Sequence, residues 1–198
     1  MIKAALFDLG GVFFEDGTDK FLRLLSQKIN KPYEELYLLF REGKSIEYRE
    51  NIISGNDFFI WASQQLDNVM SPEGLNDLWV SQYTEIVGMR DIVLRLKELK
   101  IKTGILSDNV PERVEYLQGK YHFLELFDEI ILSYEVKLTK NNHDIFNLAL
   151  SRLKLPASEV IFIDDRQSNL DLAQEVGIIP ILFSGADELK KDLNARVF

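Results

Sequence analysis

Short apolar segments that run into acidic or polar residues constrain the fold of this chain more than any other feature. Segment 2–9 carries Asp8 near its end, and segments 103–106 and 160–163 are each followed by polar residues. Each segment is typical of a buried strand, and helical patterns lie between them. Apolar strands that alternate with helices favour a parallel sheet with helices on both faces. We therefore predict an α/β fold. Further strands are predicted at 130–132 and 178–183.

The region between the first strand and about residue 88 has no comparable strand pattern. From Phe21 onwards its apolar residues recur at helical spacing, and Ser54 is placed to cap a helix. The sequence therefore predicts one α/β core domain, made of residues 1–13 and 89–198, with a helical insertion over 14–88.

Charge and composition exclude several classes of function. The 23 basic and 32 acidic residues give a net charge of -9, which argues against nucleic-acid binding, and no polybasic membrane patch is evident. The absence of cysteine excludes disulfides, thiol catalysis and cysteine-ligated zinc. No apolar run reaches the roughly 20 residues of a membrane helix, and no signal-peptide pattern follows the first strand. We expect a soluble, cytoplasmic protein.

The polar residues that follow the predicted strands are the candidates for a functional site. They are Asp8, the run 107–109 (Ser-Asp-Asn) and the pair Asp164 and Asp165. Ligands of open α/β sheets bind beyond the carboxyl ends of the strands, so these side chains are expected at one edge. Clustered carboxylates repel one another unless a cation lies among them, and oxygen ligands suit magnesium. The sequence therefore predicts a magnesium site, with a carboxylate available as a nucleophile.

Four motifs in order carry a resemblance to a known family. They are the run 7–12 (FDLGGV), the run 105–109 (ILSDN), Lys140 ahead of 145–146 (IF), and the run 161–165 (IFIDD). This set resembles the haloacid dehalogenase-like (HAD) hydrolase superfamily across nearly the whole chain. The resemblance implies a Rossmann-like parallel sheet, with the insertion as an α-helical cap domain. Ser54 ahead of Phe58 resembles the sugar-phosphatase-like branch.

The resemblance also implies a role for each strand-end acid. Asp8 matches the nucleophile that forms an aspartyl-phosphate, and it matches a magnesium ligand. The backbone carbonyl of Gly10 and the carboxylate of Asp165 match further metal ligands. Asp164 matches the neighbouring acid, which acts on the metal through water more often than directly.

Three further residues match the family's phosphate-binding groups. Ser107 matches the hydroxyl that holds a phosphate oxygen, and the backbone amide of Asp108 lies beside it. Lys140 matches the lysine that neutralises the nucleophile and the phosphate. These roles agree with phosphoryl transfer, which depends mainly on positioning and charge neutralisation.

The chain departs from the family pattern at three positions. Gly10 stands where the family's phosphatases usually carry a second Asp, which protonates the leaving group and then activates water. Asp108 stands where Asn is common, and Asn141 replaces the usual Pro after the lysine. Glu15 and Asp16 are candidates to replace the missing acid, although loop carboxylates are usually only solvated.

The function that follows is a magnesium-dependent phosphatase acting on a small phosphorylated metabolite, with a sugar phosphate as one candidate. One alternative is a non-hydrolytic or weakly active descendant that binds a phosphorylated ligand or a protein partner. A second alternative is a 2-haloacid dehalogenase-type hydrolase, in which the same Asp attacks carbon. No nucleic acid or membrane partner is expected, and monomer and dimer both stay open.

The insertion has no motif of its own, so its notable residues receive structural interpretations. Trp61, Trp79 and Tyr83 are expected in the core of the helical insertion rather than in a substrate cage. Arg41 and Arg49 are expected at the surface, with a grip on a substrate anion as the alternative.

Overall fold

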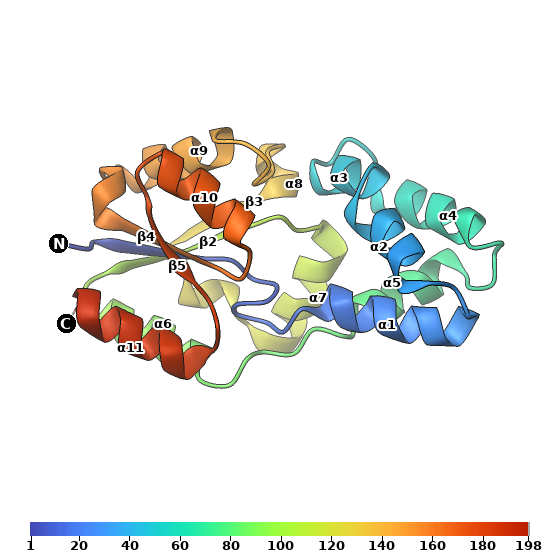
Figure 1. Cartoon of the computed structure of the whole chain (residues 1–198), viewed down its shortest axis with the longest axis horizontal. Coiled ribbons are helices and arrows are strands. Elements are labelled where there is room, and N and C mark those ends of the chain that lie inside the picture. The colour runs from blue at the N-terminus through green and yellow to red at the C-terminus, as the bar shows by residue number, and fades with distance from the viewer. Residues whose placement is uncertain (198) are drawn as a thin grey trace.

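A five-stranded parallel sheet forms the centre of the computed structural model, which describes residues 1–197 (Figure 1). The strand order is β3-β2-β1-β4-β5. The strands are β1 (Ala4–Phe7), β2 (Lys102–Ser107), β3 (Glu129–Leu132), β4 (Val160–Asp164) and β5 (Ile179–Leu182). The predicted α/β class and its parallel sheet are confirmed.

Side-chain alternation along the strands builds two hydrophobic layers, one on each face of the sheet. Phe7 of β1 belongs to one buried cluster and its neighbour Leu6 to the other, as the two-residue period of a strand requires. Figure 1 shows α9 and α10 above the sheet and α6 and α11 below it. The elements that follow the insertion are α6 (Met89–Glu98), α7 (Pro111–Tyr121), η1 (Leu124–Leu126), α8 (Ser133–Val136), α9 (Asp144–Leu153), η2 (Ala157–Glu159), α10 (Gln167–Glu175) and α11 (Ala186–Val197).

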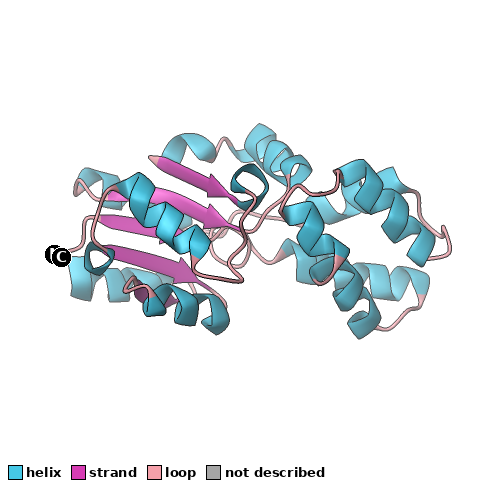
Figure 2. Ribbon diagram, turned by 90° about the horizontal axis from the view of Figure 1, so that it is seen from above, coloured by secondary structure: helices cyan, strands magenta, loops and turns pink. Residues whose placement is uncertain are grey.

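Five helices follow one another between β1 and α6, where the sequence predicts the helical insertion. They are α1 (Gly17–Ile29), α2 (Tyr33–Arg41), α3 (Lys44–Arg49), α4 (Gly55–Gln65) and α5 (Pro72–Val80). Local sequence explains their starts: the side chains of Asp16, Ser54 and Ser71 each accept a backbone N–H bond at the first turn of a helix. Figure 2 shows these helices beyond one end of the sheet.

The packing of the insertion is continuous with that of the sheet. Phe58 of α4 and Phe7 of β1 belong to the same buried hydrophobic cluster. Trp79 and Tyr83 are buried in it, and Trp61 packs against it half-buried, as the sequence predicts. The division at 13/14 and 88/89 into two domains stays a prediction. None of the helices within residues 1–197 has the length and apolar character that crossing a membrane requires.

Candidate active site

The order of the strands brings the predicted acids together. The neighbours β2, β1 and β4 are parallel, so Ser107, Asp8 and Asp164 lie at or just beyond their carboxyl ends. One carboxylate oxygen from each of Asp8, Asp164 and Asp165 lies within 4.8 Å of the other two. Three acids at this spacing repel one another in a site that is largely closed to water.

Lys140 is the cation that this cluster already contains. Its Nζ lies 3.0 Å from Asp8 Oδ1 and 2.7 Å from Asp164 Oδ2, and its side chain is only 3% exposed. Burial alone would lower the pKa of Lys140, but the charges of Asp164, Asp8 and Asp108 raise it above its usual value. One lysine therefore stays charged among three carboxylates.

The surroundings of Asp8, the candidate nucleophile, raise the pKa of its carboxyl group. Burial, together with the charges of Asp164 and Asp165, raises the pKa of Asp8 from 3.8 to about 7, against the opposing charge of Lys140. The hydroxyl of Ser107 lowers it through a hydrogen bond. Arg166 is a second cation near this site, because burial would lower its pKa but the charges of Asp8 and Asp165 raise it above its usual value. Two cations do not neutralise Asp8, Asp108, Asp164 and Asp165, so an additional cation would stabilise the ionised Asp8.

Asp165 is a candidate metal ligand, because one of its carboxylate oxygens has no partner within residues 1–197. Its Oδ1 is buried and has no hydrogen-bond partner among the described residues, and burial and the charge of Asp164 raise its pKa. A buried carboxylate oxygen is normally satisfied, so this one is available to a ligand. With Asp8 it offers the hard oxygen atoms that Mg²⁺ prefers, and the residues present therefore fit that ion.

Asp164 is fixed more firmly than the other two acids. Its Oδ1 accepts hydrogen bonds from the backbone N–H of Arg166 at 2.8 Å and from Asn169 Nδ2 at 3.1 Å. Its Oδ2 accepts from Lys140 Nζ at 2.7 Å and from Asn169 Nδ2 at 3.0 Å. With both oxygens engaged, Asp164 acts in this structure as a support that orients Lys140. Sequence reasoning missed Asn169, although it lies one helical turn beyond Asp165 at the start of α10.

The side chain of Asp108 has a contact that sequence reasoning missed. Both of its carboxylate oxygens accept the backbone N–H of Lys140, at 3.0 and 3.2 Å. Burial raises its pKa, and the charge and the backbone N–H of Lys140 oppose that rise. The acid at this unusual position therefore holds the loop that presents the lysine.

The two glycines after Asp8 differ in what they require. A Cβ on Gly11 would lie 2.2 Å from Asp165 Oδ2, and the backbone φ there is +89°, so this position needs glycine. A Cβ on Gly10 would meet only Tyr83 Cε1 at 3.5 Å, an ordinary contact, and φ is not positive. The backbone conformation at position 10 therefore does not require glycine.

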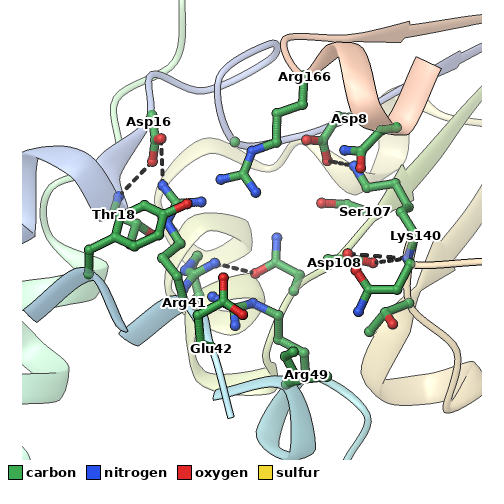
Figure 3. Close-up of a pocket in the computed structure, with 18 of the residues that line it drawn as sticks. Asp8, Asp16, Thr18, Arg41, Glu42, Arg49, Ser107, Asp108, Lys140 and Arg166 are labelled. Carbon is green, nitrogen blue, oxygen red and sulfur yellow. Dashed lines mark hydrogen bonds and ion pairs between the residues drawn. The ribbon is translucent and has the colours of Figure 1, made fainter. Parts of the chain in front are cut away.

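A cavity of about 150 Å³ lies between the sheet edge and the helical insertion. Figure 3 shows Asp8, Ser107 and Lys140 on one side of it and Arg41 with Asp16 on the other. The predicted residues that line it are Asp8, Gly10, Ser107, Asp108 and Lys140.

Asp16 and Glu15, the two candidates to replace the missing acid, differ in their position relative to the cavity. Asp16 lines the cavity, where it caps α1 and pairs with Arg41 at 2.6 Å. Glu15 pairs with Lys20 and is 44% exposed, and it is not among the lining residues. Of the two, only Asp16 reaches the space where a leaving group would lie.

The surface interpretation of Arg41 and Arg49 was wrong. Both line the cavity, and Arg49 is only 8% exposed because its guanidinium donates to the carbonyls of Phe40 and Ser45. Arg113 and Arg166 also line it, and sequence reasoning missed both. Arginine is normally exposed, so only tertiary packing could reveal these positions.

Three polar contacts join the insertion to the rest of the chain around this cavity. The hydroxyl of Tyr48 donates to Glu112, and Ser133 Oγ donates to the carbonyl of Arg49 at 2.7 Å. Thr139 Oγ1 donates to Glu50 Oε1 at 3.0 Å. Helix α3 and its C-cap Glu50 thus contact α7, α8 and Thr139 along one side of the cavity.

Sequence comparison identifies a family and several distant relatives. A family model described as haloacid dehalogenase-like hydrolase matches residues 2–177. D-ribitol-5-phosphate phosphatase of Bacteroides thetaiotaomicron is 24% identical over 189 residues, which cover 89% of both chains. Other relatives match in part: the chain spans 60%, 15% and 10% of curated proteins from Dictyostelium discoideum, Aspergillus calidoustus and Mus musculus.

Solved structures share the fold along nearly the whole chain. A HAD family enzyme of Bacteroides thetaiotaomicron superposes with a TM-score of 0.82 at 21% identity, covering 97% of this chain and 98% of that one. A structure of that enzyme with magnesium and inorganic phosphate has a TM-score of 0.77 at 23% identity, covering 93% and 96%. A HAD-like hydrolase of Porphyromonas gingivalis has a TM-score of 0.80 at 17% identity, covering 98% and 97%.

Proposed function

Because the chain belongs to the haloacid dehalogenase-like hydrolases, we propose that it is a magnesium-dependent phosphatase acting through an aspartyl-phosphate on Asp8. The observation that carries the proposal is the carboxylate cluster, with Lys140 Nζ 3.0 Å from Asp8 Oδ1. The substrate is a small phosphorylated metabolite, because the cavity above Asp8 is small. The phosphatase among the relatives and the structure with magnesium and phosphate support this reading.

Magnesium is assigned to the oxygen atoms around Asp8. Asp8 and Asp165 are its carboxylate ligands, the carbonyl of Gly10 is a third ligand, and Asp164 acts through water. The bound ion supplies positive charge that offsets the carboxylates and the phosphate. Asp165 Oδ1, buried without a partner, is the atom that supports this assignment most directly.

The side chains then divide the reaction between them. Asp8 attacks phosphorus, the bond from phosphorus to the ester oxygen breaks, and that oxygen leaves with the bonding electrons and takes up a proton. Lys140 and the Ser107 hydroxyl hold the phosphoryl oxygens and neutralise the charge that develops on them. Water then attacks phosphorus, releases inorganic phosphate and restores the carboxylate of Asp8.

The site has no side chain at position 10 that could protonate the leaving group. General acid–base help of this kind is typically worth about 10²- to 10⁴-fold in rate. Asp16 lines the cavity but is engaged by Arg41 and by the first turn of α1. We therefore propose reduced activity on substrates with a poor leaving group. The same observation favours the second candidate, a non-hydrolytic chain that binds a phosphorylated ligand.

A phosphate-release panel tests the proposal. It measures aryl and sugar phosphates with and without magnesium, beside a 2-haloacid assay for the dehalogenase alternative. Wild type should release phosphate only with magnesium, and Asp8→Asn should abolish release. Asp67→Asn is the matched control, because that side chain is 82% exposed and its variant should behave as wild type. Magnesium-independent release, or full activity of Asp8→Asn, would contradict the proposal.

A further inference from the structure

Two buried arginines meet in the cavity from opposite elements. Arg49 ends α3 in the insertion, and Arg113 lies in the first turn of α7. They are 8% and 4% exposed, and both line the cavity. Their sequence neighbours Tyr48 and Glu112 hydrogen-bond to each other, and the charge of Arg113 acts on Arg49, so the two guanidinium groups lie near each other.

Neither arginine has a carboxylate partner within residues 1–197. Arg49 donates to the carbonyls of Phe40 and Ser45 and to the Ser45 hydroxyl. Arg113 Nη1 donates to Asn109 Oδ1 at 3.2 Å, while its Nε and Nη2 are buried with no partner in the described part of the chain. Buried guanidinium nitrogens without acceptors are rare and costly, so these two indicate an acceptor that binds there.

Aromatic rings account for only part of the environment of Arg113. Its guanidinium lies 4.5 Å from the ring centre of Trp79 and 4.7 Å from that of Tyr83. This stacking favours a cation and fixes the plane of the guanidinium. It satisfies none of the N–H groups, so Nε and Nη2 still lack an acceptor in the described part of the chain, which a planar or tetrahedral anion would supply.

The charges around the pair also favour an anion. Burial and the charges of Arg113 and Arg41 together lower the pKa of Arg49 to about 10, and the charge of Asp108 only partly opposes them. Asp16 is paired with Arg41, and Glu42 lines the cavity without an ion pair to either buried arginine in the structure as described. Two cations that repel each other in a buried site are stabilised when an anion lies between them.

We propose that Arg49 and Arg113 form a second anion-binding subsite, separate from the phosphate position at Asp8. The substrate is then a small phosphorylated compound that carries a second anionic group, either a carboxylate or another phosphate. This inference rests on the proposed function, because it assigns the reacting phosphate to Asp8 and Lys140. It makes Arg113 a specificity-determining residue whose planar fork binds the non-reacting end of the substrate.

Matched ligands test the subsite while Arg49 and Arg113 are both unchanged. Binding is measured by titration calorimetry with the full-length Asp8→Asn variant and magnesium, so that no turnover occurs. The pairs are 3-phosphoglycerate against glycerol 3-phosphate, and fructose 1,6-bisphosphate against fructose 6-phosphate. The first pair adds a carboxylate and the second a phosphate. At least one doubly anionic ligand should bind about 10- to 100-fold more tightly than its partner, as hydrogen bonds to charged groups allow.

Variants of Arg113 then test whether this residue causes the tighter binding of the doubly anionic ligand. Added to Asp8→Asn, Arg113→Met should remove most of the difference within the pair, and Arg113→Lys should restore part of it. Lys120→Met is the matched control, because it removes the same charge from an exposed position on the same helix. The control should keep the preference of the parent protein.

The outcomes separate this inference from the proposed function. Equal affinities within both pairs overturn the subsite, whether or not wild type releases phosphate. Equal weakening of both members of a pair by Arg113→Met also overturns it, because Arg113 would then bind the phosphate common to both. Tight binding of a doubly anionic ligand by a chain that hydrolyses nothing would support the subsite and reject the phosphatase.

Discussion

Replacing Gly10 by an acid is the most direct test of whether this site lacks a proton donor. The structure admits the change, because a Cβ there meets only the Tyr83 ring at 3.5 Å and the backbone φ is not positive. That ring cannot easily move, since the Tyr83 hydroxyl hydrogen-bonds to Thr18 Oγ1 at 2.7 Å. The new carboxyl group of Gly10→Asp would therefore lie along a fixed wall of the cavity, near Asp8.

The expected gain depends on the leaving group. An alkoxide leaves slowly without a proton, so Gly10→Asp should raise turnover of alkyl phosphates by about 10²- to 10⁴-fold. p-Nitrophenolate is stable as an anion, so turnover of its phosphate should rise much less at the first step. Hydrolysis of the aspartyl-phosphate also gains a base, so a phosphate burst seen with wild type should disappear.

Single-turnover and steady-state phosphate release from both substrates measure these effects. Gly10→Asn is the matched control, because it has the same shape and cannot donate or accept the proton in the same way. If Gly10→Asp and Gly10→Asn behave alike, or if wild type is as fast on alkyl as on aryl phosphates without a burst, the reasoning is refuted. Asp16→Asn would then identify whether the capping acid supplies the proton.

The remaining predictions concern metal, charge and docking. Without metal the raised pKa of Asp8, about 7, means that the folded chain binds more protons than the unfolded chain above pH 3.8, so stability falls as pH rises to 7. Magnesium should therefore raise the melting temperature more at about pH 8 than at about pH 5, and an equal shift at both would contradict this. Lys140→Met should lower the free energy of unfolding by about 3–5 kcal/mol in urea titrations. The exposed Lys137→Met should change it by less than about 0.5 kcal/mol. Tyr48→Phe should raise KM about fivefold with little change in kcat, because one docking hydrogen bond is lost; an unchanged KM would show that docking does not limit binding.

The position of the candidate site could be predicted because it follows from topology. Parallel strands place their carboxyl ends at one edge, so the polar residues after Phe7, Leu106 and Ile163 were expected to converge once the strands were recognised. The apolar runs were long enough to identify all five strands. What the pattern did not specify was the support around the acids, such as Asn169 on Asp164, because hydrogen-bond partners depend on rotamers and packing.

Three α-helices of the core, α7, α8 and α11, were not predicted from the sequence, and α11 and α7 were missed for different reasons. Helix α11 is anchored by Leu189 and Leu193, which are buried while its other side chains are mostly charged. Two apolar residues one turn apart are too sparse a pattern to indicate a helix. Helix α7 begins with Pro111, and a proline in the first turn is a usable signal of a helix start. Its buried face, however, includes Arg113, and arginine is a residue type that is normally exposed to solvent.

The cavity wall opposite the acids could not be read from the sequence because it is built by long-range contacts. The residues that join Tyr48 to Glu112, the carbonyl of Arg49 to Ser133, and Glu50 to Thr139 are 64, 84 and 89 positions apart. No local periodicity records such distances, and each contact needs the insertion already folded. In the function that we propose, the strand order therefore places the reacting phosphate, whereas the contacts of α3 with α7, α8 and Thr139 place the rest of the substrate. Substitutions in α3 and α7 can consequently change which ligand binds while the carboxylates and Lys140 keep their arrangement.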